Sequence, residues 1–181
     1  MIIPNYLKKG DRVGILSTAR KISFQELKYA INLLEKWGLI VEFGDHLLGN
    51  YNQFSGTIEE RTSDLQNMIN RNDIKAIFCA RGGYGTIQII DNIDFSNLKN
   101  NPKWIVGYSD ITVLHSHLNN LGIATIHATM PINFSNNTKA SLDSLYNTLF
   151  KKENSIIYKS FDINQKGSVK GEIIGGNLSI I

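Results

Sequence analysis

Residues 75–85 read KAIFCARGGYG, a short apolar run that leads directly into an arginine and three glycines. A run of this length and composition predicts a buried strand, and the glycines after it predict a tight turn. Residues 104–112, WIVGYSDIT, repeat this arrangement, because an apolar strand ends in a short polar turn before a helix. Two such strands predict a sheet with polar loops gathered at one edge.

The rest of the chain alternates in the same way between short apolar runs and longer amphipathic segments. Ser23 and Thr57 are each suited to cap the start of a helix, and Gly38 to end one. Strands are predicted at residues 12–17, 39–43, 75–80, 104–107, 123–127 and 155–158, and helices at 23–37, after Thr57, after Gly85, at 110–121 and at 139–150.

Strands that alternate with helices indicate right-handed crossovers and an α/β fold. We predict a mostly parallel sheet flanked by helices, as in Rossmann-like or flavodoxin-like domains, over residues 1–160. Residues 159–171 are polar and contain glycine, which indicates a linker, and residues 172–181 begin a new segment. Residues 161–181 are therefore expected to be a linker and the start of a truncated C-terminal domain.

The chain has 181 residues, of which 42% are hydrophobic and 19% are charged. This length is enough for one well-buried domain, and the composition excludes a disordered or collagen-like chain. The formal net charge is only +3, from 19 Lys and Arg residues against 16 Asp and Glu residues. Since no block of basic residues is present, nucleic acid is not an expected partner.

A single cysteine, Cys79, excludes an intrachain disulfide and a thiolate cage around a metal. The N-terminal sequence lacks the charged flank and apolar segment of a signal peptide. No apolar run approaches the roughly 18 residues that would cross a bilayer. Neither H-E-x-x-H nor a Cys–His cluster occurs, so no metal site is expected. We therefore expect a cytoplasmic protein that does not bind membranes and needs no cofactor.

The turn after Gly107 presents a serine, Ser109, at the start of a predicted helix. This is the layout of a nucleophile elbow, in which a sharp strand-to-helix turn exposes a serine hydroxyl. The helix N-terminus would supply backbone N–H groups to a developing oxyanion. The second glycine of the G-x-S-x-G pattern is missing, because Ile111 follows Asp110. The alternative is that Ser109 caps the helix and Asp110 interacts with its dipole.

The glycine-rich turn at residues 81–85 is a second candidate for a binding role. Glycines after a strand let a ligand approach the backbone and expose N–H groups to an anion. The turn matches neither the phosphate loop G-x-x-x-x-G-K-[ST] nor the dinucleotide fingerprint G-x-G-x-x-G. The alternative is an ordinary tight turn that requires positive φ.

A serine nucleophile needs a base, normally a histidine that is oriented by a carboxylate. His115 and His117 follow Ser109 on the same predicted helix, where neither is well placed to reach back to its hydroxyl. His127 ends a predicted strand and is a candidate to line the site, whereas His46 lies in a long loop. The residues alone therefore give a nucleophile without an evident base.

Five stretches of the chain, taken in order, resemble the LD-carboxypeptidases. These are serine peptidases of the muramoyl-tetrapeptide carboxypeptidase type, and they include the microcin-immunity proteins. The ordered combination is far more specific than any one motif, and it covers nearly the whole chain. The stretches are residues 4–13 (P-x-x-L-x-x-G-D), 54–65 (G-T-x-x-x-R-x-x-D-L), 77–85 (the glycine-rich turn), 101–115 (the nucleophile region) and 175–179 (the start of the C-terminal domain).

This resemblance implies roles for individual residues. Ser109 aligns with the nucleophile, and the backbone N–H groups of Asp110 and Gly83 would form the oxyanion hole. Family enzymes complete a Ser-Glu-His triad from the C-terminal domain, beyond Ile181. Arg81 would either receive the terminal carboxylate of the substrate or hold the glycine turn in place. The substrate-binding candidates are Arg81, Gly82, Tyr84 and His127.

The resemblance also implies a reaction, the hydrolysis of the amide between an L-centre and a terminal D-amino acid. The expected substrate is a small peptide, the cytoplasmic murein tetrapeptide, which loses D-alanine in peptidoglycan recycling. The full-length protein is expected to be a homodimer, and the 181 residues alone to be inactive.

Two turns depart from the family pattern, at residues 17–20 (STAR) and 127–131 (HATMP), and leave the substrate preference open. One alternative is an immunity hydrolase that cleaves a peptide-nucleotide antibiotic. The other is a non-catalytic module that binds an anion at the glycine turn.

Overall fold

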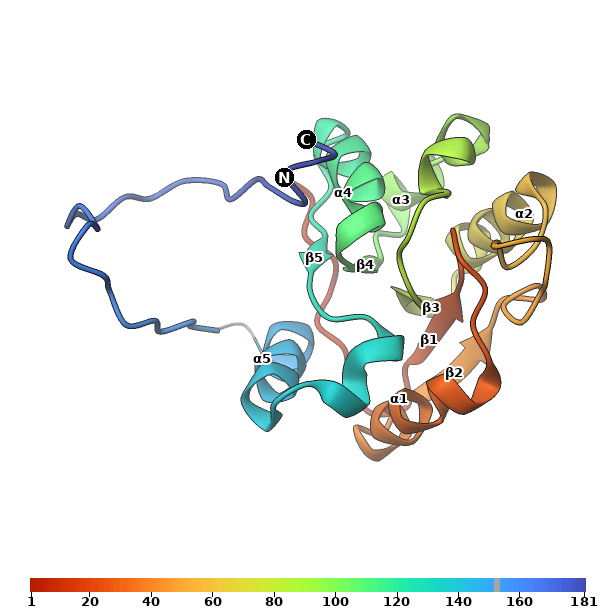
Figure 1. Cartoon of the computed structure of the whole chain (residues 1–181), viewed down its shortest axis with the longest axis horizontal. Coiled ribbons are helices and arrows are strands. Elements are labelled where there is room, and N and C mark those ends of the chain that lie inside the picture. Colours follow the sequence, from red (N-terminus) through yellow and green to blue (C-terminus); the bar gives the residue numbers. More distant parts are fainter. Residues whose placement is uncertain (152–153) are drawn as a thin grey trace.

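A computed structural model describes residues 1–151 and 154–181, and its core is one parallel sheet (Figure 1). The strand order is β2-β1-β3-β4-β5, the flavodoxin-like order. The direction in which successive strands are added across the sheet reverses between β1 and β3. This confirms the predicted α/β class and the mostly parallel sheet. The strands are β1 (Arg12–Leu16), β2 (Ile40–Phe43), β3 (Ile74–Cys79), β4 (Trp104–Gly107) and β5 (Ile126–His127).

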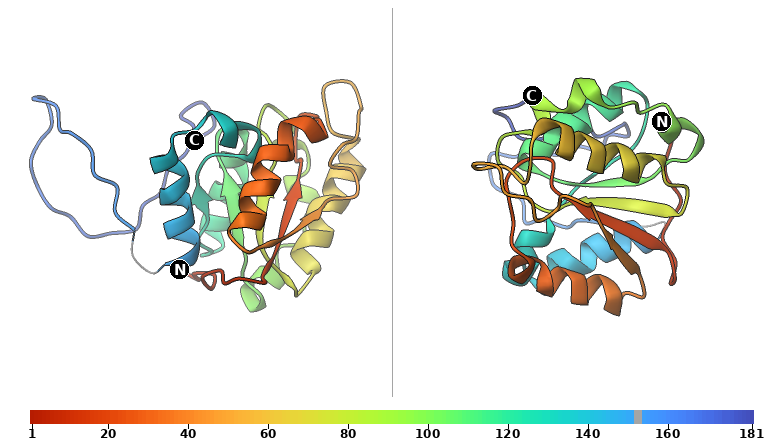
Figure 2. Two further views of the ribbon diagram at one scale, coloured as in Figure 1. Left: turned by 90° about the horizontal axis from the view of Figure 1, so that it is seen from below. Right: turned by 90° about the vertical axis from the view of Figure 1, so that its right-hand side faces the viewer.

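Helices cover both faces of the sheet, as the two views of Figure 2 show. α1 and α5 pack with one set of buried strand residues, whereas α2, α3 and α4 pack with the other set. Such double coverage explains why the central strands are apolar along their whole length. The helices are α1 (Phe24–Lys36), α2 (Ile58–Asn70), α3 (Asn97–Asn100), α4 (Thr112–Asn120) and α5 (Lys139–Phe150).

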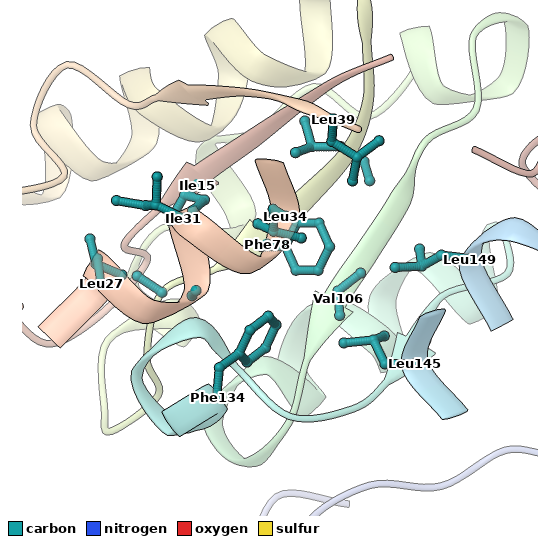
Figure 3. Packing of buried hydrophobic residues seen from close by; sticks show 14 of the residues in the cluster. Ile15, Leu27, Ile31, Leu34, Leu39, Phe78, Val106, Phe134, Leu145 and Leu149 are labelled. Atoms are coloured by element: carbon teal, nitrogen blue, oxygen red, sulfur yellow. The ribbon is translucent and has the colours of Figure 1, made fainter. Parts of the chain in front are cut away.

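The core on the side of α1 and α5 shows how the apolar pattern becomes packing (Figure 3). Leu34 from α1, Phe78 from β3 and Leu149 from α5 are all fully buried. The ring of Phe78 meets the ring of Phe134 edge-to-face, with 6.5 Å between the ring centroids. These contacts fix the sheet whose carboxyl edge carries the functional loops.

The predicted helix ends are confirmed by their side-chain contacts. The hydroxyls of Ser23 and Thr57 accept hydrogen bonds from the backbone N–H groups of Glu26 and Glu60, respectively. The carboxylate of each glutamate in turn accepts one from the backbone N–H of its cap. Gly38, at φ +87°, follows the last residues of α1 as predicted. The predicted short helix after Gly85 is present as two 3₁₀ turns, Thr86–Gln88 and Ile90–Asn92.

One predicted strand was wrong and another was too long. Residues 155–158 form no strand, because no neighbouring strand lies beside them in the described chain, and Ile157 is 91% exposed. An apolar run can form a ladder only where another backbone satisfies its N–H and C=O groups. β5 is confined to Ile126–His127, although Ile123 still bridges to Ile2 in parallel fashion.

Residues 154–175 extend away from the sheet as a loop, and the chain then returns to the start of α4 (Figure 1). There the backbone N–H of Asn177 donates to the Thr112 hydroxyl, with 2.9 Å between nitrogen and oxygen. A Cβ on Gly176 would lie 2.3 Å from Thr112 Cγ2, so this approach requires glycine. The segment therefore contacts the helix that begins three residues after Ser109.

Two features are absent from the described residues, a membrane-spanning helix and a cluster of metal ligands. No helix within residues 1–151 and 154–181 is both long and apolar enough to cross a membrane. In the same residues, no three His, Cys, Asp or Glu side chains gather in a way that could hold a metal ion.

Candidate active site

Three loops meet at the carboxyl edge of the sheet, where β1, β3 and β4 end. They are residues 17–20 after β1, residues 80–85 after β3 and residues 108–110 after β4. A Cβ on Gly85 would lie 2.9 Å from the Cα of Ala19, and one on Gly82 would lie 3.4 Å from the Cβ of Ser109. The glycine turn therefore lies between the other two loops, as expected for a crevice at a switch point in the strand order.

The turn after β4 holds Ser109 in a backbone conformation that few non-glycine residues adopt. Its φ is +61°, and the 3₁₀ turn Ser109–Ile111 leads straight into α4. A Cβ on Gly107 would lie 2.8–3.0 Å from the side chain of Ile111, so position 107, two residues before Ser109, must carry no side chain. A left-handed conformation costs a non-glycine residue on the order of 1–3 kcal/mol, and such strain concentrates at functional sites.

Ser109 is not a helix cap in this structure. The residue that precedes the 3₁₀ turn is Tyr108, and no side chain caps it. Within the described residues the Ser109 hydroxyl has no hydrogen-bond partner, and the side chain is partly exposed. The local alternative that the sequence left open, an N-cap serine, is therefore wrong, and the geometry is that of a nucleophile elbow.

Asp110 ties the elbow to the glycine turn. Its buried carboxylate accepts hydrogen bonds from the Thr86 backbone N–H (3.0 Å) and from the Thr86 hydroxyl (2.6 Å). Because the single hydroxyl proton of Thr86 goes to Asp110, the Thr18 hydroxyl must donate to Thr86 Oγ1 across 2.8 Å. A chain of buried hydrogen bonds thus joins the loops after β1, β3 and β4.

Arg61 anchors the same three-loop arrangement from α2, and the sequence analysis did not assign it a role. Its fully buried guanidinium donates to the carbonyls of Thr18 (2.7 Å) and Gly85 (3.0 Å). Burial lowers the pKa of Arg61, while the negative charge of Asp110 opposes this shift. A signal for Arg61 was present in the sequence, since it is the arginine of the G-T-x-x-x-R-x-x-D-L stretch that resembles the family pattern.

The glycine turn places free backbone N–H groups beside Ser109. A Cβ on Gly82 would lie 3.5 Å from the backbone nitrogen of Asp110, so these two backbones are in near contact. Within residues 1–151 and 154–181, the N–H groups of Asp110 and Gly83 donate to no acceptor. Two such donors next to a serine hydroxyl can hold an oxyanion.

The other predicted binding residues, Arg81, Tyr84 and His127, lie around this turn. Arg81 is partly buried, and its guanidinium donates to the backbone carbonyl of Lys21 across 3.1 Å. Tyr84 is 55% exposed at the tip of the turn. His127 is exposed at the end of β5, and its ring stacks on that of Tyr108 with 6.3 Å between centroids. His127 is therefore adjacent to the elbow.

His115 supports the elbow from α4, a role that the sequence did not reveal. Its Nε2 lies 2.9 Å from the carbonyl oxygen of Gly107, and since a carbonyl only accepts, Nε2 carries the proton. Its Nδ1 is buried without a partner in the described residues. Burial lowers the pKa of His115, and the adjacent His127 acts in the same direction. The hydrogen bond to the Gly107 carbonyl opposes this lowering of the pKa.

The remaining two histidines, His46 and His117, contact residues outside the elbow. His46 Nδ1 lies 2.8 Å from the buried carboxylate of Asp64, and this hydrogen bond raises the pKa of His46. His117 packs against the ring of Phe95. None of the four histidines hydrogen-bonds to Ser109 in the described part of the chain, so the site has a serine and oxyanion donors but no base.

A large groove of about 1180 Å³ opens next to the site rather than over Ser109. His115 and His127 line it from α4 and β5, and Ile156 and Ile174 line it from the C-terminal segment. The groove therefore separates the α/β body from residues 154–181.

The chain is similar in sequence to several known proteins. Residues 13–128 match the profile of the LD-carboxypeptidase N-terminal domain. The chain is 34% identical to a probable murein peptide carboxypeptidase of Bacillus subtilis, over 98% of this chain and 58% of that protein. It is 30% identical to the murein tetrapeptide carboxypeptidase of Pseudomonas aeruginosa, over 94% of this chain and 59% of that protein.

A solved structure shares the fold. The microcin C7 self-immunity protein in complex with aspartyl sulfamoyl adenosine superposes with a TM-score of 0.80, at 20% identity, over 98% of this chain and 58% of that one. The chain thus spans less than two thirds of the length of each of these three proteins.

Proposed function

The chain belongs to the LD-carboxypeptidase family, and we propose that it is the nucleophile-bearing part of a serine carboxypeptidase. The substrate we propose is a murein tetrapeptide, from which the enzyme releases the terminal D-alanine during cytoplasmic peptidoglycan recycling. One observation carries this proposal most strongly. Within the described residues, Ser109 stands at a strained elbow with an unpartnered hydroxyl, beside two free backbone N–H groups.

The geometry suggests the course of the reaction. The Ser109 oxygen attacks the carbonyl carbon of the L,D-amide and loses its proton to a base. The carbonyl oxygen becomes an oxyanion, which the N–H groups of Asp110 and Gly83 stabilise. As the C–N bond breaks, the base returns a proton to the leaving D-alanine amine. Water then hydrolyses the ester on Ser109 and restores the hydroxyl.

The base and its orienting carboxylate are proposed to come from a second domain. Residues 161–181 would then be a linker and the first residues of that domain, which would supply the glutamate and histidine of a Ser-Glu-His triad. The absence of a base next to Ser109 in the described residues supports this division. We further propose that the full-length enzyme is a homodimer and that the 181 residues alone are inactive.

The proposal is tested in the full-length enzyme by measuring D-alanine release from murein tetrapeptide. Ser109→Ala should reduce turnover by at least about 10⁴-fold, as is typical when a serine nucleophile is removed. Ser116→Ala, on the same helical segment, is the matched control and should retain activity. Retained turnover in Ser109→Ala would exclude this serine as the nucleophile, and robust activity of the isolated 181 residues would exclude the two-domain triad.

The microcin self-immunity protein with the same fold supports a second candidate function. Its complex with aspartyl sulfamoyl adenosine shows that this fold also accommodates an aminoacyl nucleotide analogue. The loops at residues 17–20 and 127–131, which depart from the family pattern, both border the site. Parallel assays with a murein tetrapeptide and a peptide-nucleotide would discriminate the two functions, and faster cleavage of the peptide-nucleotide would favour immunity.

A further inference from the structure

A carboxypeptidase must recognise a carboxylate next to the bond that it cleaves. In a peptide that ends in D-alanine, the terminal carboxylate carbon is three bonds from the scissile carbonyl carbon, or roughly 3–4 Å away. A receptor for that carboxylate must therefore lie about one residue from Ser109. Two arginines lie beside the glycine turn, Arg20 and Arg81. They differ in the contacts that their guanidinium groups make.

Arg20 lies across the glycine turn. Its backbone forms an antiparallel bridge with Phe54, which fixes where the side chain begins. A Cβ on Gly83 would lie 2.7 Å from Arg20 Cγ, 2.8 Å from Cδ and 3.0 Å from Nε, so the side chain packs directly on that glycine. The adjacent Gly82 packs on Ser109 in the same way. Arg20 and Ser109 therefore contact consecutive glycines, whose Cα atoms are about 3.8 Å apart.

The guanidinium of Arg20 is free to bind a ligand. Arg20 is exposed, and within residues 1–151 and 154–181 it has no carboxylate within 4 Å and donates no hydrogen bond. Arg81, in contrast, already donates to the carbonyl of Lys21. A guanidinium presents two parallel N–H groups that match the two oxygens of a carboxylate. Beside the glycine turn, Arg20 therefore keeps all of its donors unused within the described residues, whereas one donor of Arg81 is engaged.

We propose that Arg20 binds the terminal carboxylate of the substrate and so makes the enzyme select peptides with a free acid at their end. This inference rests on the proposed function, since it places the carboxylate by reference to Ser109 as nucleophile. It also gives the unusual turn at residues 17–20 a role in specificity. The packing on Gly83 holds the guanidinium beside the free N–H groups of the glycine turn.

The test compares two ligands in the full-length enzyme, an L,D-tetrapeptide with a free terminal acid and the same peptide as its terminal carboxamide. For the acid, KM and kcat are measured. For the carboxamide, the inhibition constant is measured instead, because this does not require the enzyme to hydrolyse the carboxamide. Arg20→Met should raise KM for the acid roughly 10- to 100-fold while kcat stays within about threefold. The inhibition constant of the carboxamide should hardly change, and Arg20→Lys should restore part of the loss.

Two further variants make the outcomes decisive. Lys21→Met removes the same charge one residue away and should leave both constants unchanged, which controls for long-range electrostatics. An equal loss for acid and carboxamide in Arg20→Met, or a selective loss in Arg81→Met instead, would overturn the assignment of Arg20 and leave the proposed function intact. If the wild-type enzyme hydrolyses no L,D-peptide, the proposed function fails and the role of Arg20 fails with it.

Discussion

Residues 1–150 and residues 154–181 both contain apolar side chains, but most of these are buried in the first region, whereas they are exposed in the second. In the first region Phe78 and Leu34 are fully buried, whereas in the second Ile157 and Ile173 are 91% and 97% exposed. The difference lies in the available partners, because each strand of the first region has a neighbouring strand and helices cover both faces of the sheet. An apolar pattern therefore predicts burial only where another element supplies the second surface.

The candidate active site lies at the boundary between these two regions. Its framework belongs entirely to the first region, through the buried contacts of Arg61, Thr86 and Asp110. The second region approaches it at the start of α4, where Asn177 donates to Thr112. This contrast predicts that changes in the first region affect stability strongly and that changes in the second affect it little.

The largest expected difference in stability is between two apolar truncations. Phe78→Ala should lower the free energy of unfolding by about 3–5 kcal/mol, since it removes a fully buried ring and leaves a cavity. Ile157→Ala should change it by less than about 0.5 kcal/mol, because that side chain is already in solvent. Urea unfolding of the 181-residue chain measures both, and similar losses in the two variants would contradict the contrast.

A slightly smaller loss is expected when the buried arginine is replaced. Arg61→Met should lower the free energy of unfolding by about 3 kcal/mol, because the carbonyls of Thr18 and Gly85 lose their donor and Asp110 loses a nearby positive charge. Lys170→Met, in the exposed segment, removes the same charge and should be nearly neutral. A neutral Arg61→Met would mean that the three loops are held by other contacts.

Two substitutions of Ser109 should differ in stability because of its positive φ. Ser109→Gly should be about 1 kcal/mol more stable than Ser109→Ala, because glycine adopts a φ of +61° without strain and alanine does not. Asn52→Gly, at the other positive-φ position among the described non-glycine residues, should behave similarly relative to Asn52→Ala. Thermal unfolding measures these differences, and equal stabilities of Ser109→Gly and Ser109→Ala would show that the elbow is unstrained.

Much of this framework could be predicted from the sequence, and for local reasons. The capping boxes at Ser23 and Thr57 and the strand that ends at Gly107 depend on neighbouring residues, so their signals are complete within a few positions. The predicted strand at residues 155–158 failed because a strand also needs a distant partner, which the local pattern does not contain.

The site was predictable only in part, for a related physical reason. Ser109 and Gly83 follow strands directly, so their place at the sheet edge follows from the alternation of elements. Arg61 and Thr86 act through hydrogen bonds to residues 24 to 68 positions away, and no spacing rule predicts such contacts. The donation from His115 to Gly107 spans only eight residues, but it depends on a rotamer that the sequence does not encode.

The smallest expected effect is a change in how stability depends on pH. The pKa of His115 is lowered in the folded chain by burial, so below the ordinary value of 6.5 the unfolded state binds a proton that the folded state resists. Stability should therefore fall as the pH drops below about 6.5. In His115→Gln this part of the decline should be absent, which urea unfolding at pH 5 and 7.5 would detect. An equal decline in both proteins would show that His115 does not titrate differently on folding.

We propose that the Ser109 hydroxyl, at a strained elbow, is an activated nucleophile. It is tested most directly by treating the full-length enzyme with a fluorophosphonate and locating the adduct by peptide mass spectrometry. We predict one adduct, on the peptide that contains Ser109, absent from Ser109→Ala and from the denatured protein. An adduct on another residue, or none from an enzyme that releases D-alanine, would contradict the claim, and a native protein with neither adduct nor turnover would indicate an anion-binding module instead.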